Sequence, residues 1–279
     1  MTKTKAARRP ALIPGLVSGA FLAGLTLFAA PTFAGPYEDG LAAYDRSDFD
    51  AAIKLWQPLA EAGDARAQFN IGALYQDGLG VPLDLRPAIS WWRKAAEQNY
   101  PQALHNLAML HIAGDGVSQD MAQARQYLER AQAAGSVRSV YSLAKMYLDG
   151  LGGPENKTAG FALMLRAGEM GLDKAQYNLG KMYRDGEGTH RDLVAAAAWF
   201  SRAAEQNYAA AQNHIGNRYL RGEGVAKDDA AGLSWLTIAA RNGFGPAAER
   251  LESLRPQLDG ALFAEAESRA DVFLKSVKQ

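Results

Sequence analysis

The chain has 279 residues, of which 48% are hydrophobic and 22% are charged, and its 30 basic residues equal its 30 acidic ones. This length and apolar content suffice for one large domain or two small ones with a substantial core. A formal net charge of zero gives no indication of a nucleic-acid partner. The lack of cysteine excludes a disulfide framework and a thiolate metal site.

The first 34 residues have the three-part pattern of a secretory signal. Four basic residues precede an uncharged apolar stretch at 11–30, and Thr32-Phe33-Ala34 forms a small-residue site before Gly35. The pattern predicts a signal peptide over 1–34, cleaved after Ala34, and a periplasmic or secreted protein. Cleavage leaves 26 basic against 30 acidic residues, a net charge of −4. The alternative is a retained membrane anchor, because about 20 apolar residues can span a bilayer.

The rest of the chain repeats with a period of 36 residues. The small residue that opens the first helix of each unit recurs at this interval, as Ala67, Ala103, Ser139, Ala175, Ala211 and Ala247. Each unit follows the pattern A-x-x-x-L-G/A-x-x-Y-x-x-G-x-G-x-x-x-D and closes with a second helix ending in A-A-x-x-G/N. A period of this length predicts stacked helical repeats. Stacking is required because a single pair of helices cannot bury its apolar face alone.

Three columns of the repeat mark the loop between its two helices. We expect glycines of the first column to take the left-handed conformation that ends a helix, and those of the second to let the loop turn tightly. We expect the Asp/Asn column to cap the second helix. The columns are Gly78, Gly114, Gly150, Gly186 and Gly222; then Gly80, Gly116, Gly152, Gly188 and Gly224; then Asp84, Asp120, Asn156, Asp192 and Asp228.

Apolar residues follow helical spacing in both helices of the unit. In the first helix Ile71, Leu74 and Tyr75 share a face. In the second helix a bulky column is followed one turn later by alanines that allow close helix packing; this column is Trp91, Tyr127, Leu163, Trp199 and Trp235. We therefore expect Trp91 in the core and its neighbour Trp92 to be packed as well, rather than a carbohydrate-binding tryptophan pair.

The Y-x-x-G-x-G stretch resembles the Sel1-like repeat family, a relative of the tetratricopeptide repeats. It reads Tyr75-Gln-Asp-Gly-Leu-Gly80 in one unit and Tyr183-Arg-Asp-Gly-Glu-Gly188 in another. The resemblance implies an all-α, right-handed solenoid of stacked antiparallel helix pairs. Five full repeats cover 67–246, and the shorter unit at 36–66 looks more like a plain tetratricopeptide repeat. Residues 247–279 break the period and predict C-terminal capping helices, of which the last is an amphipathic helix over 259–277.

No set of residues converges in the way that catalysis or metal binding requires. The four histidines lack ligand spacing, and loops such as Asp185-Gly-Glu187-Gly lack the further ligands of an ion or phosphate loop. We therefore predict no catalytic residue, no metal and no cofactor. The alternative is a weakly active cell-wall enzyme, because penicillin binding or hydrolysis has been suggested for secreted, cysteine-rich Sel1-like proteins.

The resemblance to tetratricopeptide repeats implies that the first helices line a concave partner-binding surface. The positions that it selects are Phe69, Asn70, His105, Asn106, Arg138, Tyr141, Lys145, Lys174, Tyr177, Asn178, Lys181 and Asn213. Aromatic and basic side chains together suit an extended peptide with acidic groups or a C-terminal carboxylate. Two alternatives stay open: the asparagines bridge neighbouring repeats, and the lysines are only solvated.

We expect, from this pattern and the signal, an exported scaffold or adaptor. It would capture another envelope protein or an extended, acidic peptide, in envelope signalling or assembly. We expect no nucleic-acid partner and no stable membrane insertion after signal cleavage. A retained signal would instead make the chain a membrane-anchored adaptor.

Overall fold

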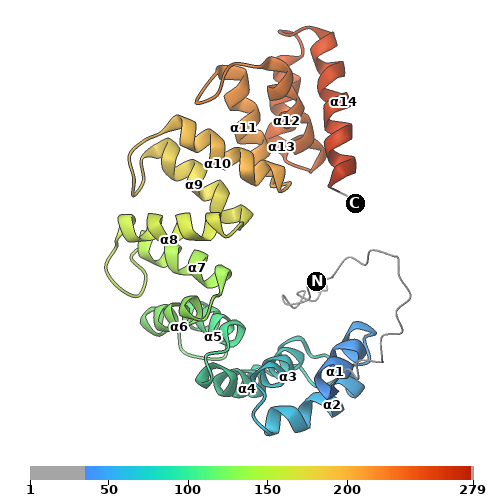
Figure 1. The fold of residues 1–279 in the computed structure, drawn as a ribbon, viewed down its shortest axis with the longest axis vertical. Helices are drawn as coiled ribbons and strands as arrows, with labels where there is room; N and C mark the ends of the chain where they lie inside the picture. Colours follow the sequence, from blue (N-terminus) through green and yellow to red (C-terminus); the bar gives the residue numbers. More distant parts are fainter. Residues whose placement is uncertain (1–34, 278–279) are drawn as a thin grey trace, which may run out of the picture. The chain divides into compact units, whose positions relative to one another are not determined.

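A computed structural model describes residues 35–277 (Figure 1). The predicted signal peptide at 1–34 lies outside the described residues. The described part consists of fourteen α-helices without a strand. Most consecutive helices pack against one another, which confirms the predicted all-α repeat architecture. Between residues 35 and 277 no helix combines the length and apolarity needed to cross a membrane.

The chain forms two compact units, which divide within α5 (Pro101–Ala113). The described part of the first unit contains α1 (Pro36–Asp45), α2 (Phe49–Glu61), α3 (Ala65–Asp77) and α4 (Leu85–Glu97). After α5, the second unit contains α6 (Met121–Ala133), α7 (Val137–Leu148), α8 (Lys157–Glu169), α9 (Asp173–Asp185), α10 (Leu193–Glu205), α11 (Ala209–Arg221), α12 (Asp229–Arg241), α13 (Gly245–Leu254) and α14 (Gly260–Ser276).

The helix ends use the residues that the repeat pattern predicts. All five glycines of the first loop column have φ between 64° and 75°, which is the left-handed region. Before the second helix of each repeat, the capping side chain accepts a hydrogen bond from a free amide of the first helical turn. These caps are Asp84, Asp120, Asn156, Asp192 and Asp228. Both predictions are confirmed.

The second glycine column has a further role, which is to let one repeat approach the next. A Cβ atom on Gly224 would lie 1.9 Å from the backbone oxygen of Leu193, and one on Gly188 would lie 2.3 Å from that of Lys157. Leu193 and Lys157 are the first residues of α10 and α8, the second helices of the preceding repeats. The loop therefore rests on the preceding repeat at a distance that only glycine permits.

The core runs along the second helices, one column later than we expected. Six residues in this column are at most 1% exposed: Trp56, Trp92, Leu128, Met164, Phe200 and Leu236. The indole N–H of Trp92 donates to the backbone oxygen of Phe69 at 3.1 Å. Trp91 is half-buried at the edge of the core, so Trp92 takes the place that we predicted for Trp91. Trp199 of the predicted column is buried, as we expected.

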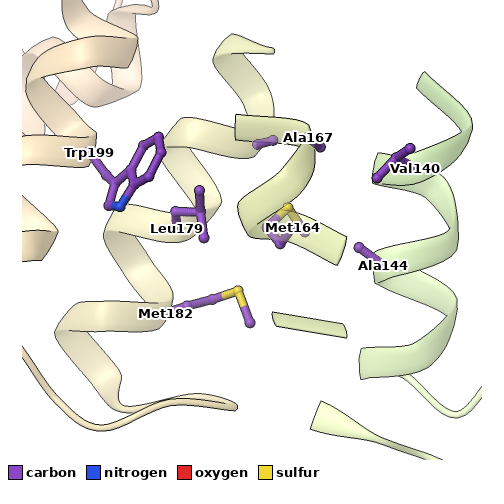
Figure 2. Packing of buried hydrophobic residues seen from close by; sticks show 8 residues of the cluster. Val140, Ala144, Met164, Ala167, Leu179, Met182 and Trp199 are labelled. Carbon is purple, nitrogen blue, oxygen red and sulfur yellow. The ribbon is translucent and has the colours of Figure 1, made fainter. Parts of the chain in front are cut away.

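Figure 2 shows the same packing within the second unit. Met164 of α8 lies among Val140 and Ala144 of α7 and Leu179 and Met182 of α9. The second helix of one repeat thus contacts both the first helix of its own repeat and the first helix of the next. Because each apolar face is covered by a neighbouring repeat, the repeats depend on one another for their stability.

The C-terminal helix closes the last repeat. Helix α14 begins after Asp259, whose side chain accepts from the Ala261 amide, and it buries Phe263, Ala266 and Ala270. It packs against α12, and Arg241 of that helix pairs with two acidic residues of α14. An apolar inner side and a charged outer side are what a terminal repeat element requires.

Candidate partner-binding face

Two of the predicted partner-binding residues are buried in the first unit. Phe69 is 5% exposed, and its ring centroid lies 5.4 Å from that of Tyr100 and 6.4 Å from that of Trp92. Asn70 is 3% exposed and donates from Nδ2 to the hydroxyl oxygen of Tyr37 at 3.2 Å. Both side chains are packing residues rather than parts of an open surface, because neighbouring aromatic rings cover them.

His105 and its surroundings are also largely structural. His105 is partly buried, and its Nδ1 lies 3.0 Å from Oγ of Ser139, which in turn donates to Ser136 at 2.8 Å. Burial, together with the positive charge of Arg138, lowers the pKa of His105 to about 4. The ring is therefore neutral near pH 7. Asn106 beside it is partly buried as well.

The remaining predicted residues lie on the first helices of the second unit. We call them the first-helix face, which comprises Arg138, Tyr141 and Lys145 of α7, Lys174, Tyr177, Asn178 and Lys181 of α9, and Asn213 of α11. Each of these side chains is exposed or partly exposed.

Hydrogen bonds join this face across neighbouring repeats. Asn178 Nδ2 donates to the hydroxyl oxygen of Tyr141 at 3.1 Å and to the backbone oxygen of Lys174 at 2.8 Å. Asn178 therefore bridges α9 to α7, which confirms for this residue the alternative that the asparagines bridge repeats. At Asn213 the side chain accepts from Asn217 at 3.3 Å within the same helix.

Tyr177 is the centre of an aromatic cluster between α9, α10 and α11. Its ring centroid lies 5.1 Å from that of Tyr208, 5.9 Å from that of Phe200 and 5.7 Å from that of His214. The His214 ring stacks on Phe200 with a centroid distance of 4.7 Å and an interplanar angle of 11°. The position of Tyr177 is thus well defined, with part of its ring left accessible.

Three lysines supply the charge of the first-helix face. Lys145 and Lys174 are exposed, and the ammonium nitrogen of Lys181 lies 5.8 Å from the centroid of the Tyr177 ring. In residues 35–277 the lysines that pair with carboxylates are others, such as Lys157 and Lys227. No carboxylate of the described chain lies within ion-pair distance of the three, so their charges are open to a partner.

A polar cavity borders the C-terminal ends of α9 and α11, and our sequence analysis missed it. It has a volume of about 530 Å³ and is lined by Arg184, Asp185, Arg191, Leu193, Arg218 and Glu223. The Arg218 guanidinium lies 5.3 Å from the centroid of the Phe200 ring, on which His214 also stacks. The cavity therefore adjoins the aromatic cluster around Tyr177.

The electrostatics of the cavity are dominated by arginine. Burial and the charges of Arg184, Arg218 and Lys181 lower the pKa of His214 to about 4. Burial also lowers the pKa of Arg218, and neighbouring arginines add to that effect. Hydrogen bonds from Arg184 hold the pKa of Asp185 below its usual range. A group of cations that repel one another in this way favours the binding of an anion.

Comparison with protein families decides the family of the chain. The Sel1 repeat matches six times, at residues 33–64, 65–100, 101–136, 137–172, 173–208 and 209–244. The chain belongs to the Sel1 repeat family. The first of these Sel1 repeats falls on the shorter unit at 36–66, and the others share the 36-residue period.

Solved structures of Sel1 repeat proteins are similar to this chain. A protective antigen of uropathogenic Escherichia coli strains has a TM-score of 0.75 at 26% identity, over 85% of this chain and 53% of that one. A Sel1 repeat protein from Oxalobacter formigenes has a TM-score of 0.72 at 25% identity, over 85% of this chain and 97% of that one. The chain thus spans about half the length of the E. coli protein. No curated protein matches it in a sequence comparison.

Sel1 repeats generally form non-catalytic scaffolds for protein interaction. Within the described part of this Sel1 repeat chain no three histidine or acidic side chains are grouped so that they could hold a metal ion. The His105–Ser139 contact has the residue types of a nucleophile and its base. However, Ser139 is fully buried, so its hydroxyl does not reach a substrate.

Proposed function

We propose that this chain is an exported scaffold that holds an acidic partner protein, or an extended acidic segment of one, on the first-helix face. The general role of Sel1 repeats in protein interaction supports a scaffold, and the signal-like pattern of residues 1–34 supports export to the periplasm or beyond. Envelope signalling or assembly is the context that we propose.

The observation that best supports this function is the unpaired charge of Lys145, Lys174 and Lys181 beside ordered tyrosines. Tyr141 is held by Asn178, and Tyr177 is held by its aromatic neighbours. A partner therefore meets aromatic surface whose conformational entropy has already been lost on folding, next to cations that attract acidic groups. Such a surface suits binding and does not provide the convergent acid, base and nucleophile of an enzyme.

The experiment is affinity capture from the native envelope with the mature chain as bait. Reversal of the three charges by Lys145→Glu, Lys174→Glu and Lys181→Glu is expected to abolish capture while leaving the circular-dichroism melt unchanged. The matched control reverses three exposed cations of the second helices, Lys54→Glu, Arg93→Glu and Arg166→Glu. This control changes the net charge by the same amount as the first triple substitution, and it is expected to retain the partner. Capture that survives the first triple substitution contradicts the proposal.

Export has its own test. Mass spectrometry of the protein isolated from cells is expected to give Gly35 as the first residue, because the small-residue site ends at Ala34. An N-terminus that retains residues 1–34 contradicts signal cleavage and favours the membrane-anchored adaptor.

The cell-wall enzyme remains the competing class. Incubation of the purified mature chain with penicillin or peptidoglycan fragments is expected to give neither turnover nor an acyl adduct. A covalent adduct detected by mass spectrometry would instead support the enzyme.

A further inference from the structure

Arg218 stands in a column that is otherwise apolar. The equivalent positions of the first helices, 36 residues apart, are Leu74, Leu110, Met146 and Met182, and all are buried. Arg218 is buried equally, with 3% of its surface exposed. Burial of a guanidinium is costly unless the charge is compensated, whereas methionine at this position packs well in the preceding repeat. Packing alone therefore does not account for an arginine here.

The charge of Arg218 has no carboxylate partner in the described part of the chain. Its Nη1 donates to the backbone oxygen of Glu223 at 3.2 Å. The two acids that line the cavity have other arginines as partners: both oxygens of Asp185 accept from Arg184 at 2.7 Å, and the Glu223 carboxylate lies 3.6 Å from Arg221. The buried cation thus borders the cavity of about 530 Å³, and no carboxylate of residues 35–277 lies within ion-pair distance of it.

Arg191 is a second cation that lines the cavity without a carboxylate partner among the described residues, and unlike Arg218 it is exposed. Its Nε donates to the backbone oxygen of Arg184 at 3.1 Å, and none of the carboxylates in 35–277 lies within ion-pair distance of it. Three arginines against two acids give the lining of the cavity a net charge of +1. This charge matches one carboxylate better than a doubly charged phosphate.

We propose that this cavity binds a carboxylate group of the partner, with Arg218 and Arg191 as its guanidinium ligands. The planar fork of a guanidinium donates two parallel hydrogen bonds to a carboxylate, which a lysine does not. The inference rests on the proposed function and names the chemistry of its partner. It extends the first-helix face from Tyr177 and Lys181 to the ends of α9 and α11.

The test begins with peptides of defined chemistry. The probes are an acetylated pentaalanine with a free C-terminal carboxylate, the same peptide with a C-terminal amide, and an amidated peptide with one central glutamate. Binding is followed by the NMR signals of the arginine Nε–H groups in the mature chain. We expect the first or third peptide, or both, to shift the Arg218 signal, and the amidated pentaalanine not to. Binding of the first peptide identifies a terminal carboxylate as the ligand, and binding of the third identifies a side-chain carboxylate. Absence of binding by both overturns the inference, as does tighter binding of inorganic phosphate.

Arg218→Met tests the residue itself and copies the preceding repeat. We expect an unchanged or higher melting temperature and about tenfold to a hundredfold weaker binding of the carboxylate peptide, because a charge-assisted hydrogen bond is lost. Arg218→Lys keeps the charge without the fork and is expected to bind with intermediate affinity. Arg166→Met, on the exposed surface of α8, makes the same change in charge and is expected to bind as the unaltered chain does.

Equal affinity of Arg218→Met and the unaltered chain overturns the inference. This failure is distinct from failure of the proposed function. A chain that captures a partner through its lysines but binds no carboxylate in this cavity contradicts only the present inference.

Discussion

The side-chain nitrogen of Gln206 lies 2.7 Å from the side-chain oxygen of Gln176, to which it donates a hydrogen bond. Gln176 in turn donates from Nε2 to the backbone oxygen of Gly168 at 3.1 Å, in the last turn of α8. These two bonds, which we call the glutamine bridge, join α8, α9 and the end of α10. They also satisfy the amide of Gln176, which is buried.

The two side-chain positions of the glutamine bridge change together from one repeat to another. Gln68 receives the bond from Gln98, and Gln212 receives it from Asn242. In the two intervening repeats both positions are apolar, with Leu104 and Ala134 in one and Val140 and Met170 in the other. A buried amide without its partner costs free energy, whereas an apolar pair at the same positions does not.

Gln206→Met alone is therefore expected to destabilise the chain by roughly 1–2 kcal/mol, because it leaves the Gln176 oxygen buried without a donor. Adding Gln176→Val reproduces the apolar pair of the 137–172 repeat and is expected to restore most of the loss. Urea unfolding followed by circular dichroism measures both. If Gln206→Met alone lowers the free energy of unfolding as little as the double substitution does, the two glutamines are not coupled and the prediction is contradicted.

Gly224→Ala tests the contact between a loop and the preceding repeat. The residue has φ of 75°, and a Cβ atom would lie 1.9 Å from the Leu193 oxygen. We expect a loss of roughly 3 kcal/mol, from left-handed strain together with overpacking. Gly260→Ala is the control, because no atom lies near its Cβ position and its φ is not positive. Equal melting temperatures for Gly224→Ala and Gly260→Ala would contradict the close approach.

Acidification is expected to destabilise the chain through His214. The pKa of this histidine is about 4 in the folded chain, against 6.5 for an exposed histidine, so folding favours the neutral form. The stabilisation is complete above about pH 6.5 and is lost as the pH falls towards about 4.

His214→Asn isolates this effect, because asparagine occupies the same column at Asn70, Asn106 and Asn178. His105 has the same shift and is present in both proteins, so it cancels in the comparison. The free energy of unfolding of the variant is expected to fall less between pH 6.5 and pH 4, by an amount of order 1 kcal/mol. If the free energy of unfolding falls with pH in the same way in both proteins, the role of His214 is contradicted.

Local rules of the repeat made the helices, their caps and their loop glycines predictable from sequence. Asp192 and Gly186 act through neighbours within a few residues, so the 36-residue pattern suffices. The burial of Phe69 was not predictable in that way, because it depends on Tyr100 of the same unit and on Trp92 turning inward in place of Trp91.

The candidate site was predictable in part. Lys145, Lys174 and Lys181 were selected by column position, and the structure leaves their charges unpaired within the described residues. Arg218 was missed, although the sequence contains the signal: it is the one charged residue in a column of leucine and methionine. Its meaning depends on Asp185 and Glu223 being engaged by other arginines, which only three-dimensional contacts show.

Cross-linking mass spectrometry of the captured complex tests most directly the claim that a partner is held on the first-helix face. Lysines of both helix types are exposed enough to react, which makes their comparison informative. We predict cross-links from the partner to Lys145, Lys174 and Lys181 on α7 and α9. Cross-links confined to Lys54, Lys94 and Lys157 on the second helices would contradict the claim.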